Sequence, residues 1–192
     1  MRANRTLTEQ ARRAQIVTAA IEVIARDGAA QASFKSIAQE AGLSSTGMIS
    51  YHFAGKQELI AEVGREILER FGEFVLARTS GVEEPAAILR GFVEANVEFL
   101  RTHRSHAATL IRIKSDLAPV ELALSDQAAL AAVLQQGQTD GVLRDFDPQL
   151  MAVMILSIRD GLVRQFDLDP ALDLDAAAAE FTALVDLATR KA

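Results

Sequence analysis

The sequence predicts an all-α protein of about nine helices, with an N-terminal three-helix bundle and a larger C-terminal helical domain. Alanine and leucine dominate the 192 residues, 49% of the chain is hydrophobic, tryptophan is absent and tyrosine occurs once. This composition favours helices over sheets. Apolar residues recur at helical spacing, and we find no strand pattern, no internal repeat and no low-complexity tract beyond the alanines at 176–179.

The composition also excludes several classes of chemistry. The absence of cysteine excludes disulfides, thiol catalysis and zinc–thiolate sites. No apolar run reaches the length of about 18 residues that a membrane span needs, and the N-terminus lacks the apolar core of a signal peptide. We therefore expect a cytoplasmic protein with no membrane association and no cofactor.

The first helix is expected to run from Thr6 to about Asp27. Thr6 and Glu9 have the spacing of a capping box, in which each side chain bonds a free backbone N–H of the other residue. Gly28 follows the helix and is expected to end it. The predicted buried stripe consists of Ile16, Ala20, Val23 and Ile24.

Residues 33–58 predict two short helices joined by a tight turn. Ser33 can cap the first of them, and Gly42 follows it where the chain often needs a left-handed conformation. Ala38 is small, which lets two helices cross closely. The predicted inner face of this helix consists of Phe34, Ile37, Ala38 and Ala41.

The second short helix begins after Leu43, which provides an apolar plug at the corner. We expect Ser44 or Ser45 to cap this helix and Met48 to point inward. Helix, turn and helix together form the arrangement of a helix-turn-helix, whose second helix enters the major groove of DNA.

The distribution of charge supports a nucleic-acid partner for the N-terminal part despite a net charge of −6. Residues 1–60 carry seven Lys/Arg against five Asp/Glu, and residues 61–192 carry 13 against 21, a balance of −8. Phosphate binding depends on local basic groups rather than on total charge. We expect a basic arm that reaches the DNA backbone or minor groove, with a disordered tail as the alternative for the first two residues. Its members are Arg2, Arg5, Arg12 and Arg13.

The rest of the chain predicts further helices. Lys56 opens one that continues to about Arg78, and residues 79–82 are the best candidate boundary between two units. Asp147 and Pro148 are a start signal, with Asp as cap and Pro in the first turn. Gly137 is expected to end the preceding helix. The other expected helices span 85–100, 105–114, 119–136, 148–166 and 175–190, and the expected domains are 1–55 and 79–192, connected by the helix at 56–78.

The segment from Gln15 to about Val63 resembles the tetracycline-repressor (TetR) family of transcription regulators. The resemblance lies in Ile16-Val-x-Ala-Ala, Gly28, Phe34-x-x-Ile37-Ala38-x-x-Ala41-Gly42-Leu43, and Thr46-Gly-Met-Ile-Ser-Tyr51-His52-Phe53-x-x-Lys56-x-x-Leu59. Residues 158–162 and 166–170 are similar to the C-terminal part of the subgroup that contains the choline/betaine regulator.

The resemblance implies a ligand-responsive DNA-binding regulator whose C-terminal domain binds an effector and forms a homodimer. The expected function is that of a repressor, released from a palindromic operator in double-stranded DNA by a small-molecule effector. An activator is a variant of this interpretation. The alternatives are an architectural DNA-binding protein, which the acidic C-terminal part disfavours, and an enzyme with a DNA-binding appendage. We find no glycine-rich phosphate loop, no nucleophile motif and no catalytic residue.

The resemblance also assigns DNA contacts to individual residues. Tyr51, His52 and Lys56 are expected at backbone phosphates, where the start of the helix at Lys56 adds free N–H groups. Lys35 and Ser36 are expected at a flanking phosphate, and Phe53 in the core. The leading face of the second helix carries no Arg or Lys, so bidentate reading of guanine is not expected there. That face consists of Ser44, Ser45, Thr46, whose hydroxyl and methyl suit adenine or thymine, and Gly47.

The C-terminal part offers a candidate effector pocket and a dimer interface. A polar residue among apolar helices is costly unless it has a partner, so Asn96 is the preferred candidate for orienting a ligand. The expected pocket residues are Phe71, Phe74, Phe92, Asn96, Phe99, Arg112, Met151, Met154, Arg159 and Phe166. The expected interface residues, on the helices at 148–166 and 175–190, are Ile155, Leu156, Leu162, Leu184 and Leu187.

A metal site is a further hypothesis from the spacing of two histidines. His103 and His106 are three residues apart on a possible helix, and Asp116 follows further on. No third ligand stands at a fixed spacing, and cysteine is absent. We therefore expect no metal site, and interpret the histidines as residues at a solvated helix end.

Overall fold

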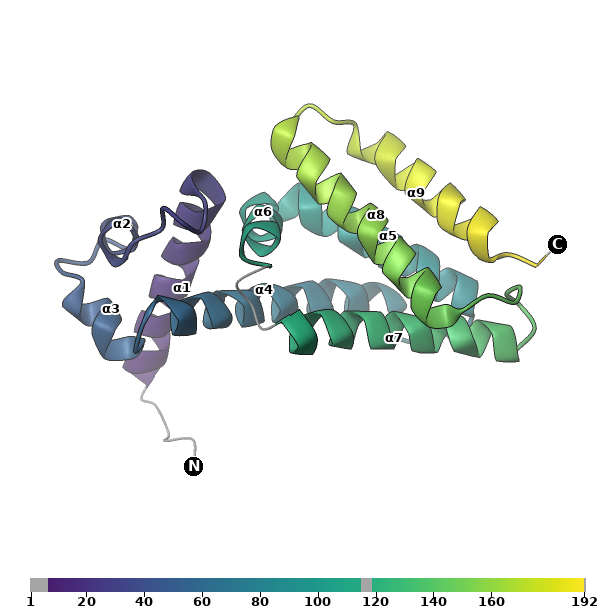
Figure 1. The fold of residues 1–192 in the computed structure, drawn as a ribbon, viewed down its shortest axis with the longest axis horizontal. Coiled ribbons are helices and arrows are strands. Elements are labelled where there is room, and N and C mark those ends of the chain that lie inside the picture. Colours follow the sequence, from purple (N-terminus) through teal and green to yellow (C-terminus); the bar gives the residue numbers. More distant parts are fainter. Residues whose placement is uncertain (1–6, 115–118, 192) are drawn as a thin grey trace. The chain divides into compact units, whose positions relative to one another are not determined.

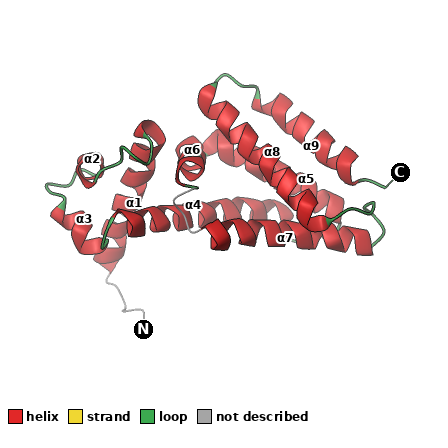
Figure 2. Cartoon of the chain, viewed as in Figure 1, coloured by secondary structure: helices red, strands yellow, loops and turns green. Residues whose placement is uncertain are grey.

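The computed structural model describes the main chain of residues 7–114 and 119–191, so Arg2, Arg5, Thr6 and Asp116 lie outside the described residues. Figures 1 and 2 show the helices of this part of the chain. They are α1 (Leu7–Asp27), α2 (Phe34–Glu40), α3 (Gly47–His52), α4 (Lys56–Thr79), α5 (Pro85–Thr102), α6 (Arg104–Ile113), α7 (Pro119–Thr139), α8 (Pro148–Leu168) and α9 (Leu174–Thr189). The described residues contain no strand except an isolated bridge between Leu143 and Arg190. None of the described helices is long and apolar enough to cross a membrane. The all-α prediction is confirmed.

The chain divides into two compact units. The first unit runs through Leu68 and includes α6 from Ser105, and the second contains the remainder. Helix α6 belongs to the first unit because it is hydrogen-bonded to α1. The hydroxyl of Thr109, which is completely buried, donates to the carbonyl oxygen of Ile21 at 2.8 Å. Such contacts between residues far apart in sequence leave no local signal.

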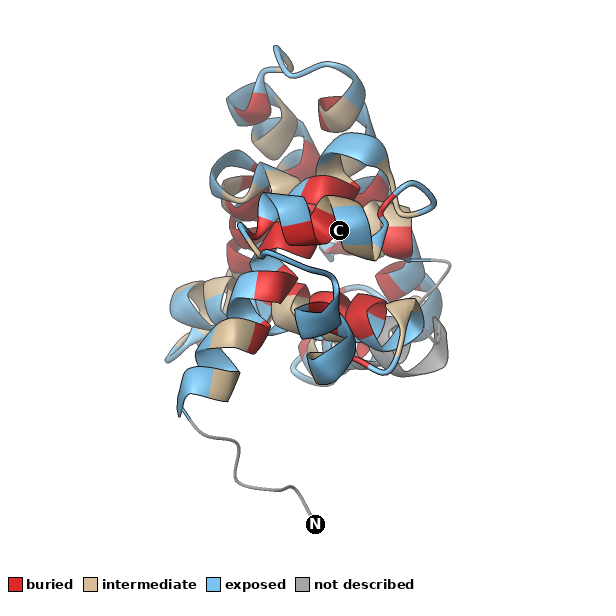
Figure 3. Ribbon diagram, turned by 90° about the vertical axis from the view of Figure 1, so that its left-hand side faces the viewer, coloured by how far each residue is buried: buried red, intermediate tan, exposed pale blue. Residues whose placement is uncertain are grey.

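The core of the first unit forms around α1. Figure 3 shows buried and exposed residues alternating around the helices. The stripe predicted for α1 is confirmed, since Ile16, Ala20, Val23 and Ile24 are each at most 1% exposed. Helix α2 packs against α1 and contributes Ile37 to this core. Burial of one face per helix is the main stabilisation of such a bundle.

The second unit is built from α5, α7, α8 and α9 together with the C-terminal part of α4. Helix α5 packs against α7 and α9, and α8 packs against the same two helices. The predicted start of α8 is confirmed, because the Asp147 carboxylate accepts hydrogen bonds from the N–H groups of Gln149 and Leu150 at 2.9 and 3.1 Å. Proline follows directly in the first turn, where its missing N–H costs nothing.

Gly137 does not end α7, contrary to the expectation. The helix continues to Thr139, and Gly141 takes the left-handed backbone with φ of 69°. Gly137 lies inside the helix, and the position requires glycine because an added Cβ would lie 2.5 Å from the Leu143 side chain. The glycine therefore serves close packing rather than helix termination.

Gly42 ends α2 in the left-handed region, as predicted, with φ of 65°. A Cβ added at Gly42 would meet no atom within 4 Å, and neither would one at Gly72 in the middle of α4. An alanine at either position therefore causes no steric clash, so its effect on stability reports only the backbone conformation at that position.

Gly42→Ala is expected to lower the free energy of unfolding by about 1 kcal/mol, because alanine is strained at positive φ. Gly72→Ala is the control and is expected to raise it by about 0.5–1 kcal/mol, because alanine favours the helix interior. Urea unfolding at equal protein concentration measures both. A stabilising Gly42→Ala would contradict a left-handed end of α2.

Candidate nucleic-acid interface

The start of α2 is held by a reciprocal cap. The N–H of Ser36 donates to the Ser33 hydroxyl at 3.1 Å, and the N–H of Ser33 donates to the Ser36 hydroxyl at 2.9 Å. The predicted cap at Ser33 is thus confirmed. The Ser36 hydroxyl itself donates to the Ser33 carbonyl at 2.9 Å, whereas Lys35 is exposed. Of this pair, Lys35 is the residue whose side chain can reach an external phosphate without breaking the cap.

The turn after α2 is fixed by main-chain hydrogen bonds and by one side chain of α1. The N–H of Leu43 donates to the Ala38 carbonyl at 2.8 Å, which closes the turn over Gly42. The side-chain amide of Gln15 donates to the Ala41 carbonyl at 2.6 Å. Ala38 is only 4% exposed, as expected for a close helix crossing. The turn that leads into α3 therefore has a defined direction.

Helix α3 turns a different residue inward from the one predicted. Ile49 is completely buried and Phe53, just after the helix, is 1% exposed. These two residues are four apart and so lie on the same side of the chain. Met48 stands one position earlier, points away from that side and is 43% exposed. The inward residue is therefore Ile49, and Met48 belongs to the outer surface.

Neither Ser44 nor Ser45 is the cap of α3. The cap position is Thr46, whose backbone is already helical with φ of −71° and ψ of −17°, and whose side chain makes no capping hydrogen bond. A side-chain cap requires an extended backbone at that position, so that the oxygen can reach the free N–H groups. All three residues and Gly47 are exposed. The leading face of α3 thus presents hydroxyl groups that are not used for capping.

The predicted phosphate ligands lie at the end of α3 and the start of α4. Tyr51 is 73% exposed, and its hydroxyl is 3.5 Å from a Glu9 carboxylate oxygen. Its ring meets the His52 ring edge-on, with 5.1 Å between the centroids. The Lys56 ammonium donates to the Ala30 carbonyl at 3.3 Å. These groups can all donate hydrogen bonds, which is the chemistry that a phosphate oxygen requires.

Arg13 was expected in a basic arm, but it is buried, with 7% exposure. Its Nη1 donates to the His52 carbonyl at 2.5 Å, and its Nε and Nη2 lie 3.3 and 3.2 Å from the two carboxylate oxygens of Glu62. Burial raises the pKa of Glu62, but hydrogen bonds from Arg65 and Arg13 outweigh this effect and hold the pKa below its ordinary value. The carboxylate is therefore ionised at neutral pH, and Arg13 is occupied inside the unit.

In the second unit the structure brings most of the predicted aromatic residues together. The centroid of the Phe99 ring lies 5.4 Å from that of Phe71 and 5.4 Å from that of Phe74. His103, which was interpreted as a residue at a solvated helix end, stacks on Phe99 with 4.9 Å between the ring centroids. Burial lowers the pKa of His103, and the charge of Arg70 lowers it further. We call the set of Phe71, Phe74, Phe92, Phe99 and His103 the aromatic cluster.

The polar residues predicted for the pocket do not all join this cluster. Asn96 is buried, and its amide donates to the Phe92 carbonyl of its own helix at 2.7 Å. Arg112 belongs to the first unit, where it donates to the Ile24 carbonyl at 3.3 Å. Arg159 pairs with its neighbour Asp160 at 3.1 Å. Arg112 thus contacts α1, on which α6 packs. Of the remaining predicted pocket residues, Met151 and Phe166 are buried.

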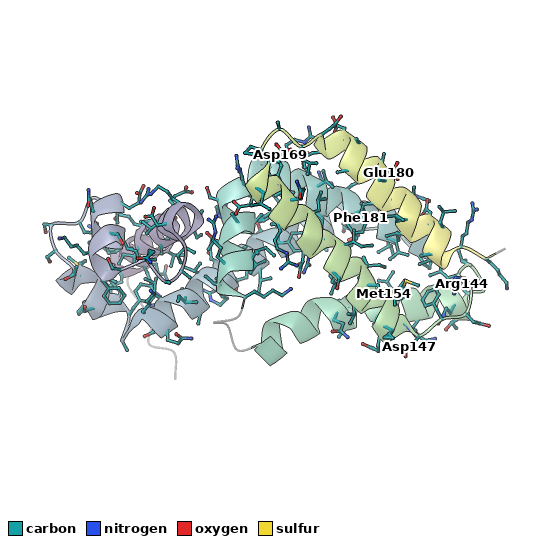
Figure 4. All side chains as sticks on the ribbon, turned by 45° about the horizontal axis from the view of Figure 1, so that its top comes forward. Arg144, Asp147, Met154, Asp169, Glu180 and Phe181 are labelled. Carbon is teal, nitrogen blue, oxygen red and sulfur yellow. The ribbon has the colours of Figure 1, made fainter. Side chains whose placement is uncertain are left out.

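Helices α8 and α9 carry an exposed apolar face, part of which was predicted. Leu184 and Leu187 are 50% and 60% exposed, but Ile155 is 2% exposed and packs inside the unit instead. Met154, which was expected in the pocket, is 56% exposed and is labelled on α8 in Figure 4. Leu156 and Leu162 are half-buried. We call the exposed set the α8–α9 face, and it consists of Leu150, Val153, Met154, Ile158, Leu184 and Leu187.

Sequence reasoning missed the role of Arg13 and the place of His103. A signal was present for Arg13, because it is adjacent to the stripe residues of α1 and precedes Ile16 by one helical turn. Its partners, however, are 39 and 49 residues further along the chain. For His103 the spacing to His106 suggested a ligand pair, whereas the spacing of four to Phe99 indicated the observed stack.

Comparison with known proteins agrees with this geometry. Residues 16–63 match the sequence model described as bacterial regulatory proteins, tetR family. The HTH-type transcriptional regulator BetI 2 of Chromohalobacter salexigens is 31% identical over 182 residues, which cover 91% of this chain and 86% of that protein. Matches with several other curated BetI proteins cover less than half of their length.

Solved structures share the whole fold at lower identity. AibR, in complex with isovaleryl coenzyme A and operator DNA, superposes with a TM-score of 0.79 at 19% identity, over 91% of this chain and 97% of that one. A protein from Saccharomonospora viridis in complex with choline gives 0.77 at 23% identity, over 95% and 100%. Family match, full-length relative and fold agree. The chain therefore belongs to the tetR family of bacterial regulatory proteins and is a DNA-binding transcriptional regulator.

Proposed function

We propose that this protein is a repressor that binds a near-palindromic operator as a homodimer and is released by a small-molecule effector. The observation that carries the proposal is the exposure of α3, whose leading residues are small and polar while Ile49 holds the helix in the core. A helix of this kind can enter the major groove. The protein acts where bacterial DNA lies, in the cytoplasm, and we assign it no catalytic role.

We assign base reading to the leading face of α3 and phosphate binding to its surroundings. Thr46 offers a hydroxyl and a methyl group, which suit the adenine and thymine edges of the major groove. We assign the phosphate contacts to Tyr51, Lys56 and the exposed Lys35. His52 lies beside Tyr51 and adds a further donor. Ser44, Ser45 and Gly47 complete the leading face, where hydroxyl groups and bare backbone let the helix approach closely.

We assign dimerisation to the α8–α9 face. Its residues on α8 repeat at spacings of three and four, so they form one stripe along the helix. Leu184 and Leu187 on the neighbouring α9 add to it. Large apolar side chains gathered on an exposed face are typical of an interaction surface, and a two-fold axis lets the same face cover itself. Two protomers would then place two α3 helices on successive turns of the operator.

We assign effector binding to the second unit, at the aromatic cluster beside Asn96. Ring faces and edges bind apolar groups and, through their quadrupole, quaternary ammonium cations. Proteins of the same fold have been solved with choline and with isovaleryl coenzyme A. Effector and operator weaken each other's binding reciprocally if they favour different conformers. Helix α4 is the natural link, because it contributes residues to both units.

Lys56→Ala is expected to weaken binding to all duplexes alike and to reduce the slope of log affinity against log salt by about 1, because one counterion fewer is released. Tyr51→Phe removes a neutral donor, so it should weaken binding with no change of slope. Thr46→Ala should keep the slope and alter the base preference of duplexes selected from a random pool. Binding isotherms at several salt concentrations measure all three, and a normal slope for Lys56→Ala would reject its phosphate contact.

Leu187→Asp is expected to convert the dimer into a monomer, because a carboxylate would be buried at the α8–α9 face without a partner. The residue is 60% exposed in the protomer, so the monomer itself should keep its helix content. Leu76→Asp on α4, 64% exposed, is the matched control and should stay dimeric. Sedimentation equilibrium decides the matter, and a dimer of normal stability would place the interface elsewhere.

Choline and isovaleryl coenzyme A are the probes for the effector site, each added to the wild-type protein in a thermal unfolding experiment. The compound that binds should raise the midpoint temperature. Phe74→Ala, at a half-buried ring of the cluster, should weaken its binding about tenfold, the effect of losing one aromatic contact. Leu76→Ala, exposed on the same helix, should bind normally. Unchanged binding by Phe74→Ala would remove the cluster from the site.

A further inference from the structure

Helix α3 cannot hold its own orientation. It has six residues, fewer than an isolated helix needs to be stable in water. Ile49 and Phe53 anchor it in the core, but apolar burial is non-directional and leaves rotation about the contact poorly defined. Reading of base edges, in contrast, requires side chains placed to within about 0.5 Å. A directional interaction must therefore set the angle of α3.

The buried Arg13 guanidinium provides that interaction. It donates to the carbonyl of His52, the last residue of α3, at 2.5 Å, and it contacts both carboxylate oxygens of Glu62 on α4. A carboxylate oxygen of Glu58 is 3.6 Å away, and the guanidinium carbon lies 4.0 Å above the Phe53 ring. The side chain is 9% exposed. Contacts in its plane and on its face together fix both its position and its orientation.

The chemistry of this contact suits arginine alone. The last carbonyl groups of a helix lack partners within the helix and form the negative end of its dipole, so a cation is stabilising there. A planar fork of donors can serve a carbonyl on one side and a carboxylate on the other, while its face stacks on a ring. A lysine has one point charge and cannot satisfy both partners with fixed geometry.

We propose that Arg13 is a positioning residue for DNA recognition, which joins the end of α3 to α4 and thereby sets the angle at which Thr46 and Tyr51 are presented. It does so without touching DNA. Its carbonyl partner, His52, directly follows Tyr51 and lies six residues after Thr46, the cap residue of the same helix. The inference rests on the proposed function, in which α3 reads the operator.

Gln15 gives independent support, because its side chain binds a carbonyl at the C-terminal end of α2, as Arg13 does for α3. It stands two residues after Arg13 on α1 and donates to the Ala41 carbonyl at the end of α2. Two polar side chains of α1 thus bind the C-terminal ends of both helices of the motif. Gln15 is neutral, whereas Arg13 is charged and also pairs with Glu58 and Glu62 of α4.

Arg13→Lys tests the proposal, with a duplex selected from a random pool by the wild-type protein and a scrambled duplex of equal composition. The variant keeps the charge and loses the fork. We expect normal helix content, an unchanged salt slope, and a ratio of selected to scrambled affinity about tenfold lower, the effect of disturbing a base contact. The matched control is Arg65→Lys, because Arg65 contacts the same Glu62 at 2.7 Å from the exposed side; it should keep the wild-type ratio.

Two results with Arg13→Lys would overturn the proposal. Equal weakening of both duplexes, with an unchanged affinity ratio, would mean that the arginine binds a phosphate itself. A lower unfolding temperature with a normal affinity ratio, measured well below that temperature, would mean that it only stabilises the fold. If the wild-type protein selects no sequence at all, the proposed function fails first and this inference with it.

Glu62→Gln is the second variant, in case Arg13→Lys does not fold. It preserves the size of the side chain and the bond from Arg13 to the His52 carbonyl, but it removes the charge that holds the guanidinium toward α4. We expect a smaller loss of the affinity ratio in the same direction, about threefold, because the His52 carbonyl and the Glu58 carboxylate remain as partners of the guanidinium. A folded Glu62→Gln protein with the full wild-type ratio would overturn the role of the link to α4.

Discussion

The N-terminal unit depends on hydrogen bonds from α1 to the ends of two short helices. Arg13 binds the last carbonyl of α3 and Gln15 binds the carbonyl that follows α2. Both helices are too short to persist alone, so their directions are set by these contacts and by the burial of Ile37 and Ile49. The exposed surface of α3 is a consequence, because the groups that fix the helix all lie on its inner side or at its end.

In the same unit, the Arg13–Glu62 ion pair and the leading face of α3 involve different residues. Arg13, next to the core, pairs with Glu62. The leading face of α3 carries hydroxyl groups and no long basic side chain. Such a surface binds weakly by itself, since few counterions are released by it. The proposed pairing of two copies would therefore raise the affinity, and the α8–α9 face in the second unit is the apolar area that we assign to it. In the proposed function, the aromatic cluster gives that unit a second role, in effector binding.

Features that depend on neighbours in sequence were predicted well. The caps at Ser33 and Asp147 and the left-handed Gly42 follow from the backbone groups within a few residues. The features that failed depend on distant partners. Arg13 is adjacent to the α1 stripe yet pairs across 49 residues, Gly137 is required by Leu143, and Ile155 is inside because α8 packs on two helices. The prediction that Met48 points inward was wrong because the next residue, Ile49, occupies the buried side of α3.

The sequence by itself determined the helices, both ends of α2, the start of α8 and the family, because local hydrogen bonds and helical periodicity depend on residues that are close in sequence. It also carried the resemblance from Gln15 to Val63, which the family match over residues 16–63 confirms. Only the tertiary structure decided which polar groups are inside. The guanidinium of Arg13, the hydroxyl of Thr109 and the ring of His103 each meet a partner on another helix. Burial of a polar group depends on where that partner lies in space, and spacing along the chain does not contain that information.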